Sequence, residues 1–364
     1  MFNSVSTPTS SLRSRRLVAL LGAGLLAAAL GGTPAGPAAA SPAHRAAARV
    51  VSHAVAFDVE NTNATSVPCL ADDGSYTLRG RLIGPRRDVA GLGGSFRVDV
   101  LVHDLGTGRW FWNLRSHPAY DYATHLARRG ETVLVLDRLG YGASRLADGR
   151  ATCLGADADM LHQVVQELRS GRFRFTDGTR SSPPSAAHVV LQGHGVGAAI
   201  AQVEASSFDD VDGLVLMSWT DRGASAVATQ AAARQNADCL TADYAPFAAS
   251  AAQFKDLLFT SAPRAVQRTA AARRAPDPCG DATSLLPLLA GSNLGAGRVD
   301  VPVLLMYGAD DKLNRADARD QQAASYSTPV TTRTFARSGS ALPLEASADR
   351  VRSTVLRWLS HRPR

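Results

Sequence analysis

The side chains best suited to chemistry in this 364-residue chain stand where predicted buried strands end. His194 follows a strand expected at residues 188–192, and His103 ends another. Asp310 and Asp311 follow a third strand later in the chain. Imidazole and carboxylate groups act as general acids and bases and activate nucleophiles. Which of these residues can meet depends on the elements that carry them.

The tightest of these elements is the turn Gly193-His194-Gly195-Val196-Gly197. It joins the strand at 188–192 to a helix whose apolar residues recur at helical spacing from Val196 to Val203. The turn resembles the nucleophile elbow of the α/β-hydrolase superfamily, where a G-x-S-x-G sequence lifts a strained serine above a parallel sheet. Gly195 stands at the serine position, and glycine adopts such backbone angles without a side-chain penalty.

Two more loops resemble loops of the same superfamily. The run Asp137-Arg138-Leu139-Gly140-Tyr141-Gly142-Ala143-Ser144 resembles the D-x-x-G-x-G-x-S segment after the fourth strand. The run His103-Asp104-Leu105-Gly106 resembles the H-G loop after the third strand, which donates one N–H to the oxyanion hole. Asp104 stands where glycine is usual, and a carboxylate there would repel a developing oxyanion. This departure counts against acyl transfer.

The triad of this superfamily runs in the order nucleophile, acid, histidine, and each position can be located in the chain. Asp311 fills the acid position, with Asp310 as its neighbour. Family members read roughly G-H-x-x-x-x-E after the last strand, where Ser340 stands at the histidine position. The only histidine beyond Asp311 is His361, in the C-terminal tail. Without nucleophile and base, hydrolysis is expected to fall by about a millionfold, equivalent to about 8 kcal/mol of barrier.

The resemblance implies an α/β-hydrolase fold, a mostly parallel sheet with helices on both faces and a helical cap insertion. The alternation of predicted strands and helices favours the same class. We expect a signal peptide at 1–40, a linker at 41–50, a core at 51–221 and 298–364, and a cap or lid at 222–297. Ligands of such sheets bind at the carboxyl ends of the strands. The residues expected to contact a ligand there are His103, Asp104, Leu105, Tyr141, Val196 and Trp219.

The N-terminus has the three parts of an export signal: three arginines before residue 17, an apolar run at 17–30 and small residues at 38–40. We expect cleavage after Ala40 and a secreted protein, and the Arg15-Arg16 pair also permits the twin-arginine route. The apolar run is too short to favour a membrane span. Loss of the three arginines lowers the net charge from +7 to +4. No basic run interleaved with aromatic residues indicates nucleic-acid binding.

The chain has four cysteines, an even number that in an exported protein predicts two disulfides with three possible connectivities. We favour Cys69–Cys153 and Cys239–Cys279, because the second pair would lie wholly inside the expected cap. No pair has C-x-x-C spacing and no H-E-x-x-H sequence occurs, so no metal site and no cofactor are predicted.

Three functions remain open, and binding of a small, partly apolar molecule is the first. The protein would act as a pseudoenzyme or catalyse a non-hydrolytic elimination, isomerisation or cyclisation. The second is an active esterase or lipase-like hydrolase, in which Ser218 or Ser340 works with His194 or His103. The third is a dinucleotide-binding protein, because residues 193–198 also satisfy G-x-G-x-x-A between a strand and a helix. For both histidines, packing or hydrogen bonding is the alternative to catalysis.

Overall fold

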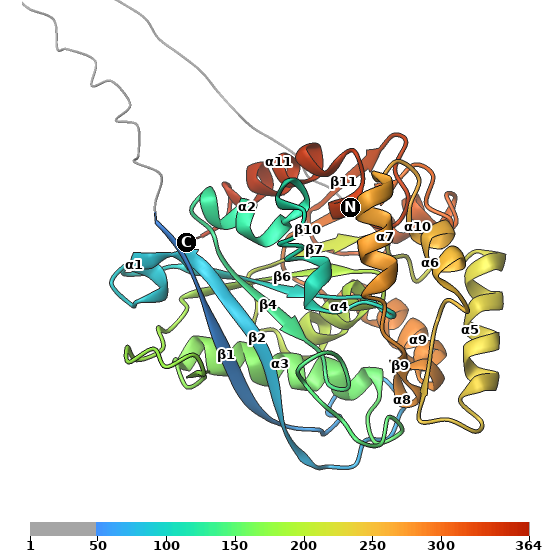
Figure 1. The fold of residues 1–364 in the computed structure, drawn as a ribbon, viewed down its shortest axis with the longest axis horizontal. Helices are drawn as coiled ribbons and strands as arrows, with labels where there is room; N and C mark the ends of the chain where they lie inside the picture. The colour runs from blue at the N-terminus through green and yellow to red at the C-terminus, as the bar shows by residue number, and fades with distance from the viewer. Residues whose placement is uncertain (1–48, 364) are drawn as a thin grey trace, which may run out of the picture. The chain divides into compact units, whose positions relative to one another are not determined.

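The computed structural model describes residues 49–363, so the expected signal peptide and most of the linker lie outside the described residues. Nine strands of this part of the chain form one sheet in the order β11-β10-β7-β6-β3-β4-β2-β1-β5 (Figure 1). The strands are β1 Val50–Glu60, β2 Ser75–Pro85, β3 Arg97–Val102, β4 Thr132–Asp137, β5 Arg174–Phe175, β6 His188–His194, β7 Gly213–Met217, β10 Val303–Gly308 and β11 Val330–Phe335.

The centre of the sheet is parallel and buried on both faces. β4, β3, β6, β7, β10 and β11 pair in parallel, and every residue of β3, β4, β7 and β10 is buried. Their mostly apolar sequences are typical of strands covered on both sides. β2 pairs antiparallel with β4 and β1 antiparallel with β2, so the two long first strands extend the sheet in antiparallel fashion.

Helices cover both faces of the sheet. Neighbouring residues of β3 point to opposite faces, so Val100 packs with α3 and α4 whereas Leu101 packs with α2 and α11. In Figure 1, α2 and α11 lie above the sheet and α3 lies below it. The helices of the core are α1 Arg86–Val89, α2 Tyr122–Arg128, α3 Leu154–Ser170, α4 Val196–Phe208, α10 Ala318–Ala324 and α11 Ala348–Leu359. Short 3-10 turns are Arg109–Phe111, Pro118–Tyr120, Ala296–Arg298 and Leu342–Leu344.

The chain between β7 and β10 is mainly helical, and the sequence places the cap here. Its elements are α5 Ala226–Asp238, β8 Tyr244–Ala245, α6 Ala251–Leu258, α7 Arg264–Ala272, β9 Asp277–Pro278, α8 Cys279–Thr283 and α9 Leu285–Gly295. Ser225 and Ser250 begin α5 and α6, because each hydroxyl accepts a hydrogen bond from an amide of the first turn. α9 packs against α4, so the last helix of the expected cap belongs to the same packed layer as the core.

Two disulfides join the four cysteines in the pairing that the sequence favours. Cys69 bonds to Cys153 at the start of α3, and Cys239 at the end of α5 bonds to Cys279. The second bridge therefore closes a loop within the segment between β7 and β10. None of the helices described between residues 49 and 363 is long and apolar enough to cross a membrane.

Candidate active site

The turn between β6 and α4 has the backbone geometry of an elbow. Gly195 has φ 53° and ψ −125°, and its N–H donates to the carbonyl of Met217 at 2.9 Å. A side chain at Gly197 would collide with the backbone of Val102 and His103, so the helix starts in contact with the end of β3. The small residues of the motif are thus needed for close packing, and position 195 is held at the carboxyl end of the sheet.

The side chain of Asp104 occupies the space in front of Gly195. Its Oδ1 accepts hydrogen bonds from the amides of Leu105 and Val196, both at 2.8 Å. In α/β-hydrolases the oxyanion hole is formed by the amide after the nucleophile and an amide of the loop after the third strand. Leu105 and Val196 provide the amides at these two places, and the carboxylate of Asp104 takes both. A Cβ atom at position 195 would overlap the same carboxylate.

His194 is fully buried behind the turn. Its Nε2 lies 2.9 Å from the carbonyl oxygen of Ser340 and 3.4 Å from the Ser340 Oγ. Its Nδ1 lies 3.6 Å from Oδ2 of Asp104, and its ring stacks on Phe111 with centroids 4.4 Å apart. Burial raises the pKa of Asp104, while His194 and the two amides oppose that rise. Asp104 therefore holds its proton to a higher pH than an exposed aspartate does, with an imidazole beside it.

Asp311 is buried and hydrogen-bonded within its own loop. Its Oδ1 accepts from the amide of Leu313 and its Oδ2 from Nδ2 of Asn314, both at 2.9 Å. Burial raises the pKa of Asp311, and the two hydrogen bonds lower it. Within residues 49–363 no hydrogen bond joins Asp311 to a histidine, and His361 is exposed in the tail. Among these residues, the buried His194 acts on Asp311 only through space, by lowering its pKa, and does not hydrogen-bond to it.

Ser218 and Ser340, the serines of the hydrolase alternative, meet at one carbonyl group. Ser218 has φ 54°, and its Oγ donates to the carbonyl of Ser340 at 2.7 Å, the same oxygen that faces His194. Ser340 is fully buried, whereas Ser218 lines a cavity. The Ser218 hydroxyl and the His194 imidazole therefore share one buried acceptor, and the Ser340 hydroxyl lies beside the same imidazole.

A cavity of about 230 Å³ lies between the elbow and the helices α5, α6 and α9. Its walls are mainly apolar, and among residues 49–363 Asp104 is the only ionisable side chain that lines it. Of the residues expected to contact a ligand, Asp104, Leu105, Val196 and Trp219 line this cavity. Larger apolar side chains from the other elements complete the wall: Phe247, Phe254, Leu258, Leu285, Leu286, Leu289 and Leu313.

His103 and Tyr141 are not among the residues that line this cavity, and their contact with a ligand stays a prediction. Nε2 of His103 accepts from the amide of Arg138 at 3.1 Å, and its Nδ1 faces the carbonyl of Asp104 at 2.9 Å. Burial and the nearby Arg138 hold the pKa of His103 well below its usual range, so the ring is neutral. The Tyr141 hydroxyl is buried and donates to carboxylates instead. Both residues support the loops beneath the cavity.

The backbone of the elbow, the position of the loop after β3 and the strand order resemble those of α/β-hydrolases. Residues 100–354 match the model of the alpha/beta hydrolase family. The chain belongs to this family. No curated protein matches it at a significant level.

Solved structures show how this α/β-hydrolase compares with others. A thermophilic esterase from Thermogutta terrifontis is 18% identical with a TM-score of 0.59, over 83% of this chain and 98% of that one. An enol-lactonase from Burkholderia xenovorans LB400 is 15% identical with a TM-score of 0.57, over 79% and 97%. A hydrolase from Pseudomonas aeruginosa PA01 is 20% identical with a TM-score of 0.55, over 80% and 97%. At these identities the likeness shows the fold alone.

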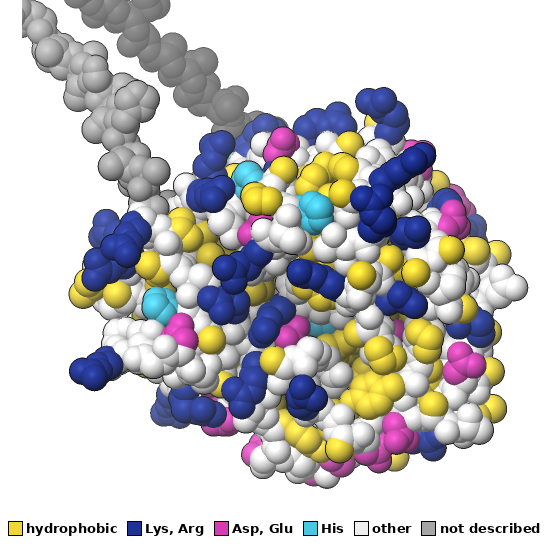
Figure 2. Space-filling model, in the orientation of Figure 1, with side chains coloured by type: hydrophobic (Ala, Val, Ile, Leu, Met, Phe, Trp, Pro, Cys, Tyr) yellow, Lys and Arg dark blue, Asp and Glu magenta, His cyan; other side chains and the backbone are white. Residues whose placement is uncertain are grey.

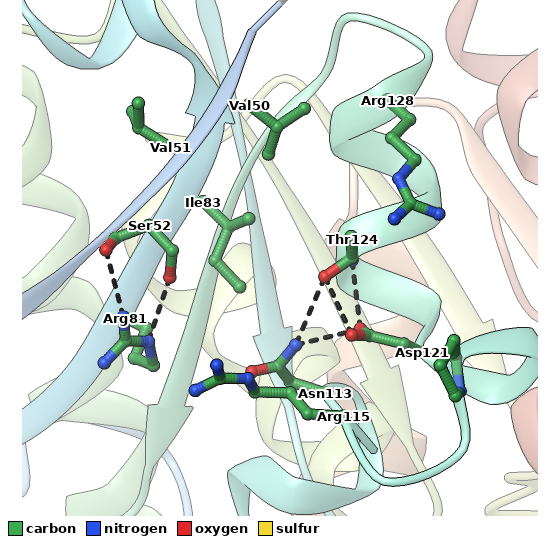
Figure 3. A pocket seen from close by; sticks show the side chains of 11 residues that line it. Val50, Val51, Ser52, Arg81, Ile83, Asn113, Arg115, Asp121, Thr124 and Arg128 are labelled. Atoms are coloured by element: carbon green, nitrogen blue, oxygen red, sulfur yellow. Dashed lines mark hydrogen bonds between the residues drawn. The ribbon is translucent and has the colours of Figure 1, made fainter.

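A second pocket of the α/β-hydrolase, of about 310 Å³, lies beside β1, β2 and α2 (Figure 3). Arg81, Arg115 and Arg128 contribute to its wall, and Arg81 is anchored by hydrogen bonds to Ser52. Its residues differ from those of the cavity at the elbow. Across the face shown in Figure 2, Lys and Arg side chains are spread out with acidic side chains between them, rather than gathered into one continuous run.

The sequence also missed a group of possible metal ligands. His162, Glu204 and Asp210 each place one ligand atom within 4.8 Å of the others. They come from two helices and a loop, at spacings that match no short metal-binding motif, so only the packing of α3 against α4 could reveal them.

Proposed function

We propose that the chain is a secreted α/β-hydrolase-fold protein that binds a small, largely apolar molecule beneath the cap and lacks serine-hydrolase activity. The observation that carries this proposal is the position of Asp104. Its carboxylate fills the space of a side chain at position 195 and takes the amides of Leu105 and Val196. An acyl-transfer intermediate needs those amides for its oxyanion.

The cavity supports a ligand with one polar end. Its apolar walls favour a hydrocarbon body, and the single carboxyl group favours a hydrogen-bond donor such as a hydroxyl or an amine. The same carboxyl, 3.6 Å from Nδ1 of His194, is the group that would move a proton in a non-hydrolytic elimination or isomerisation. A pyrophosphate fits poorly, because Asp104 already holds the amide at the start of α4. This argues against the dinucleotide hypothesis.

Titration with three matched aromatic probes tests the ligand class. We expect 1-naphthylmethylamine and 1-naphthylmethanol to bind, followed by fluorescence, and 1-naphthoate to bind at least about tenfold more weakly because Asp104 repels it. Asp104→Asn keeps an oxygen for the two amides and presents a donor to the cavity, so it should bring the affinity for naphthoate close to that for the alcohol. Ala232→Trp, which fills the cavity, should abolish binding of all three. Equal binding of naphthoate and amine by the parent protein would refute the ligand class.

An active hydrolase is the second candidate, favoured by the position of Ser218. This hydroxyl lines the cavity and shares an acceptor with His194, and the structural neighbours include a protein described as an esterase. The assay is turnover of p-nitrophenyl butyrate by the parent, Ser218→Ala and Ser340→Ala, with Thr229→Ala in the cavity wall as the matched control. Parent activity that only the Ser218 or Ser340 change abolishes would establish the hydrolase. Background turnover in all four proteins supports the binding protein.

A further inference from the structure

Three side chains that could bind a metal ion meet where α3, α4 and the loop before β7 come together. His162 lies on α3, Glu204 on the last turns of α4, and Asp210 in the following loop. One ligand atom from each lies within 4.8 Å of the others. None of these residues lines either pocket. The cluster is therefore independent of the site at the elbow.

Four buried atoms of this cluster have no hydrogen-bond partner: Nδ1 of His162, both carboxylate oxygens of Glu204 and Oδ1 of Asp210. Glu204 is 0% exposed, so water does not solvate its carboxylate from the surface. Nδ1 of His162 lies 2.8 Å from Oδ2 of Asp210, but the two groups are not aligned as a hydrogen bond. An unpartnered buried carboxylate is strongly unfavourable, and a bound cation or proton offsets that cost.

The cluster has too little positive charge nearby to neutralise the carboxylates of Glu204 and Asp210. Burial raises the pKa of Glu204 well above its usual value, and the facing carboxylate of Asp210 raises it further. Arg169 opposes this rise, yet its hydrogen bonds go to the carbonyls of Asp210 and Ala187 and to the carboxylate of Asp212. Gln166 donates to Oδ2 of Asp210 at 2.5 Å and holds that side chain in place. The carboxylates of Glu204 and Asp210 therefore lie against each other, and neither oxygen of Glu204 accepts a hydrogen bond from an N–H group among residues 49–363.

We propose that His162, Glu204 and Asp210 bind a divalent transition metal ion, with Zn²⁺ as the best match. One imidazole nitrogen with two carboxylates suits zinc, whereas calcium and magnesium favour oxygen ligands alone. Ligand atoms about 2.1 Å from one ion lie at most about 4.2 Å apart, so a spread of up to 4.8 Å needs a closure of well under 1 Å. The side chains of His162 and Asp210 are 24% and 12% exposed, which leaves a path for the ion and room for a water ligand.

Such an ion would tie α3 to the end of α4. α4 begins at the elbow, so the ion would hold the helix that positions Val196. Because the ligands are brought together only by folding, the ion would bind the folded chain and stabilise it. The expected role is structural and separate from any reaction in the cavity.

Calorimetric titration of the purified, EDTA-treated protein with Zn²⁺ tests the site. We expect one ion per chain with micromolar affinity or better, a raised Tm with Zn²⁺ but not with Mg²⁺, and a visible Co²⁺ spectrum that reports the imidazole ligand. Glu204→Gln keeps the size of the side chain, and His162→Phe keeps the stacking on Phe208, whose ring centroid is 4.0 Å away. Each variant should weaken Zn²⁺ binding by about a hundredfold or more. Loss of a residue that only hydrogen-bonds to a metal ligand already lowers metal affinity by about ten- to a hundredfold.

The matched control is His188→Phe, which removes another histidine paired with an aspartate, 2.8 Å from Asp212. It should change Zn²⁺ affinity by less than about tenfold. If Glu204→Gln does not fold, the His162 variant and the Co²⁺ spectrum of the parent decide the question. No saturable binding at one ion per chain, or affinity in His162→Phe within about threefold of the parent, would overturn the proposal. Glu204 would then be a protonated acid sharing its proton with Asp210.

Discussion

At the elbow, the carboxylate of Asp104 occupies the space that a side chain at position 195 would need. The residue type at each of the two positions therefore depends on the other. A side chain at 195 would overlap the carboxylate of Asp104. With glycine there, the carboxylate reaches the amides of Leu105 and Val196 at 2.8 Å. A change at either residue alone leaves the other in a site that no longer suits it, so the two positions should be coupled energetically.

Gly195→Ala should destabilise the parent more than it destabilises an Asp104→Gly background. In the parent it adds the overlap with Asp104 to the backbone cost of φ 53°, about 1–3 kcal/mol. In the Asp104→Gly background only the backbone cost remains. Urea unfolding of the four proteins should give a coupling free energy of at least about 1 kcal/mol. Gly130→Ala, at φ 94° with no atom near the added Cβ, is the control and should show no coupling to Asp104. If the effects of the changes at 195 and 104 on the free energy of unfolding are additive, the two side chains do not compete for the same space.

Sequence reasoning placed these residues in the right loops but not in contact. The elbow could be recognised because glycines at 193, 195 and 197 stand between an apolar strand and a helix. Asp104 was expected to repel an oxyanion from nearby. Its side chain instead folds over the amides of Leu105 and Val196, and that contact depends on how closely the loop after β3 approaches α4. No local pattern encodes such an approach.

The cap segment is joined to the core by a buried network of charged residues. Arg138, after β4, contacts Asp157 on α3 and bonds to Asp281 on α8 at 2.8 Å. The Tyr141 hydroxyl donates to Asp281 and to Asp277 on β9, both at 3.0 Å. One guanidinium group therefore faces two carboxylates in a buried site. Such a site is expected to hold a proton that the unfolded chain would release.

Asp157 should make the protein less stable as the pH rises. Burial and the carboxylate of Asp281 raise the pKa of Asp157 to about 8, against an attraction by Arg138. An aspartate in the unfolded chain has a pKa of about 4. The folded chain thus binds the proton more tightly, and the resulting stability is complete below about pH 4 and lost by about pH 8.

Thermal unfolding of Asp157→Asn between pH 5 and pH 8.5 measures this contribution. Asparagine imitates the protonated acid and keeps an oxygen for Arg138. The decline in Tm with rising pH should therefore be smaller by several degrees in the variant than in the parent. The exposed residue Asp320, changed to Asn, should leave the parent profile unchanged. A variant profile parallel to that of the parent would show that Asp157 is ionised throughout this range.

At the level of secondary structure, the alternation of strands and helices and the hydrophobic periodicity were sufficient to predict the sheet and the helices that cover it. β3, β4, β7 and β10 are buried on both faces, so their apolar runs are strong signals. The two-residue strands β5, β8 and β9 have no such signal, because they are held by a neighbouring strand rather than by their own sequences. The packing of α9 on α4 is likewise a tertiary contact.

Across the whole molecule, the disulfides fit a protein that folds outside the reducing cytoplasm, as we propose from the N-terminal sequence. The Cys69–Cys153 bridge ties the segment after β1 to α3, and the Cys239–Cys279 bridge lies between β7 and β10. The pairing could be favoured from the sequence because the second pair falls inside one insertion.

Removal of the Cys239–Cys279 bridge should lower the free energy of unfolding by about 2–4 kcal/mol, as expected for a bridge that closes a loop of 40 residues. The double variant Cys239→Ser, Cys279→Ser should also be cleaved faster by proteases between residues 222 and 297. The matched pair Cys69→Ser, Cys153→Ser should be destabilised without faster cleavage in that range. Equal cleavage of the two variants within 222–297 would show that the bridge does not stabilise this segment locally.

The most direct test of the central claim is the intact mass of the purified mature protein after treatment with a fluorophosphonate, a reagent that bonds to activated serines. The account predicts no adduct, because Asp104 fills the space of a nucleophile at Gly195 and holds the amides that would bind an oxyanion. A known serine hydrolase treated in parallel should be labelled completely. One adduct per chain at Ser218 or Ser340 would contradict the account and establish an active hydrolase.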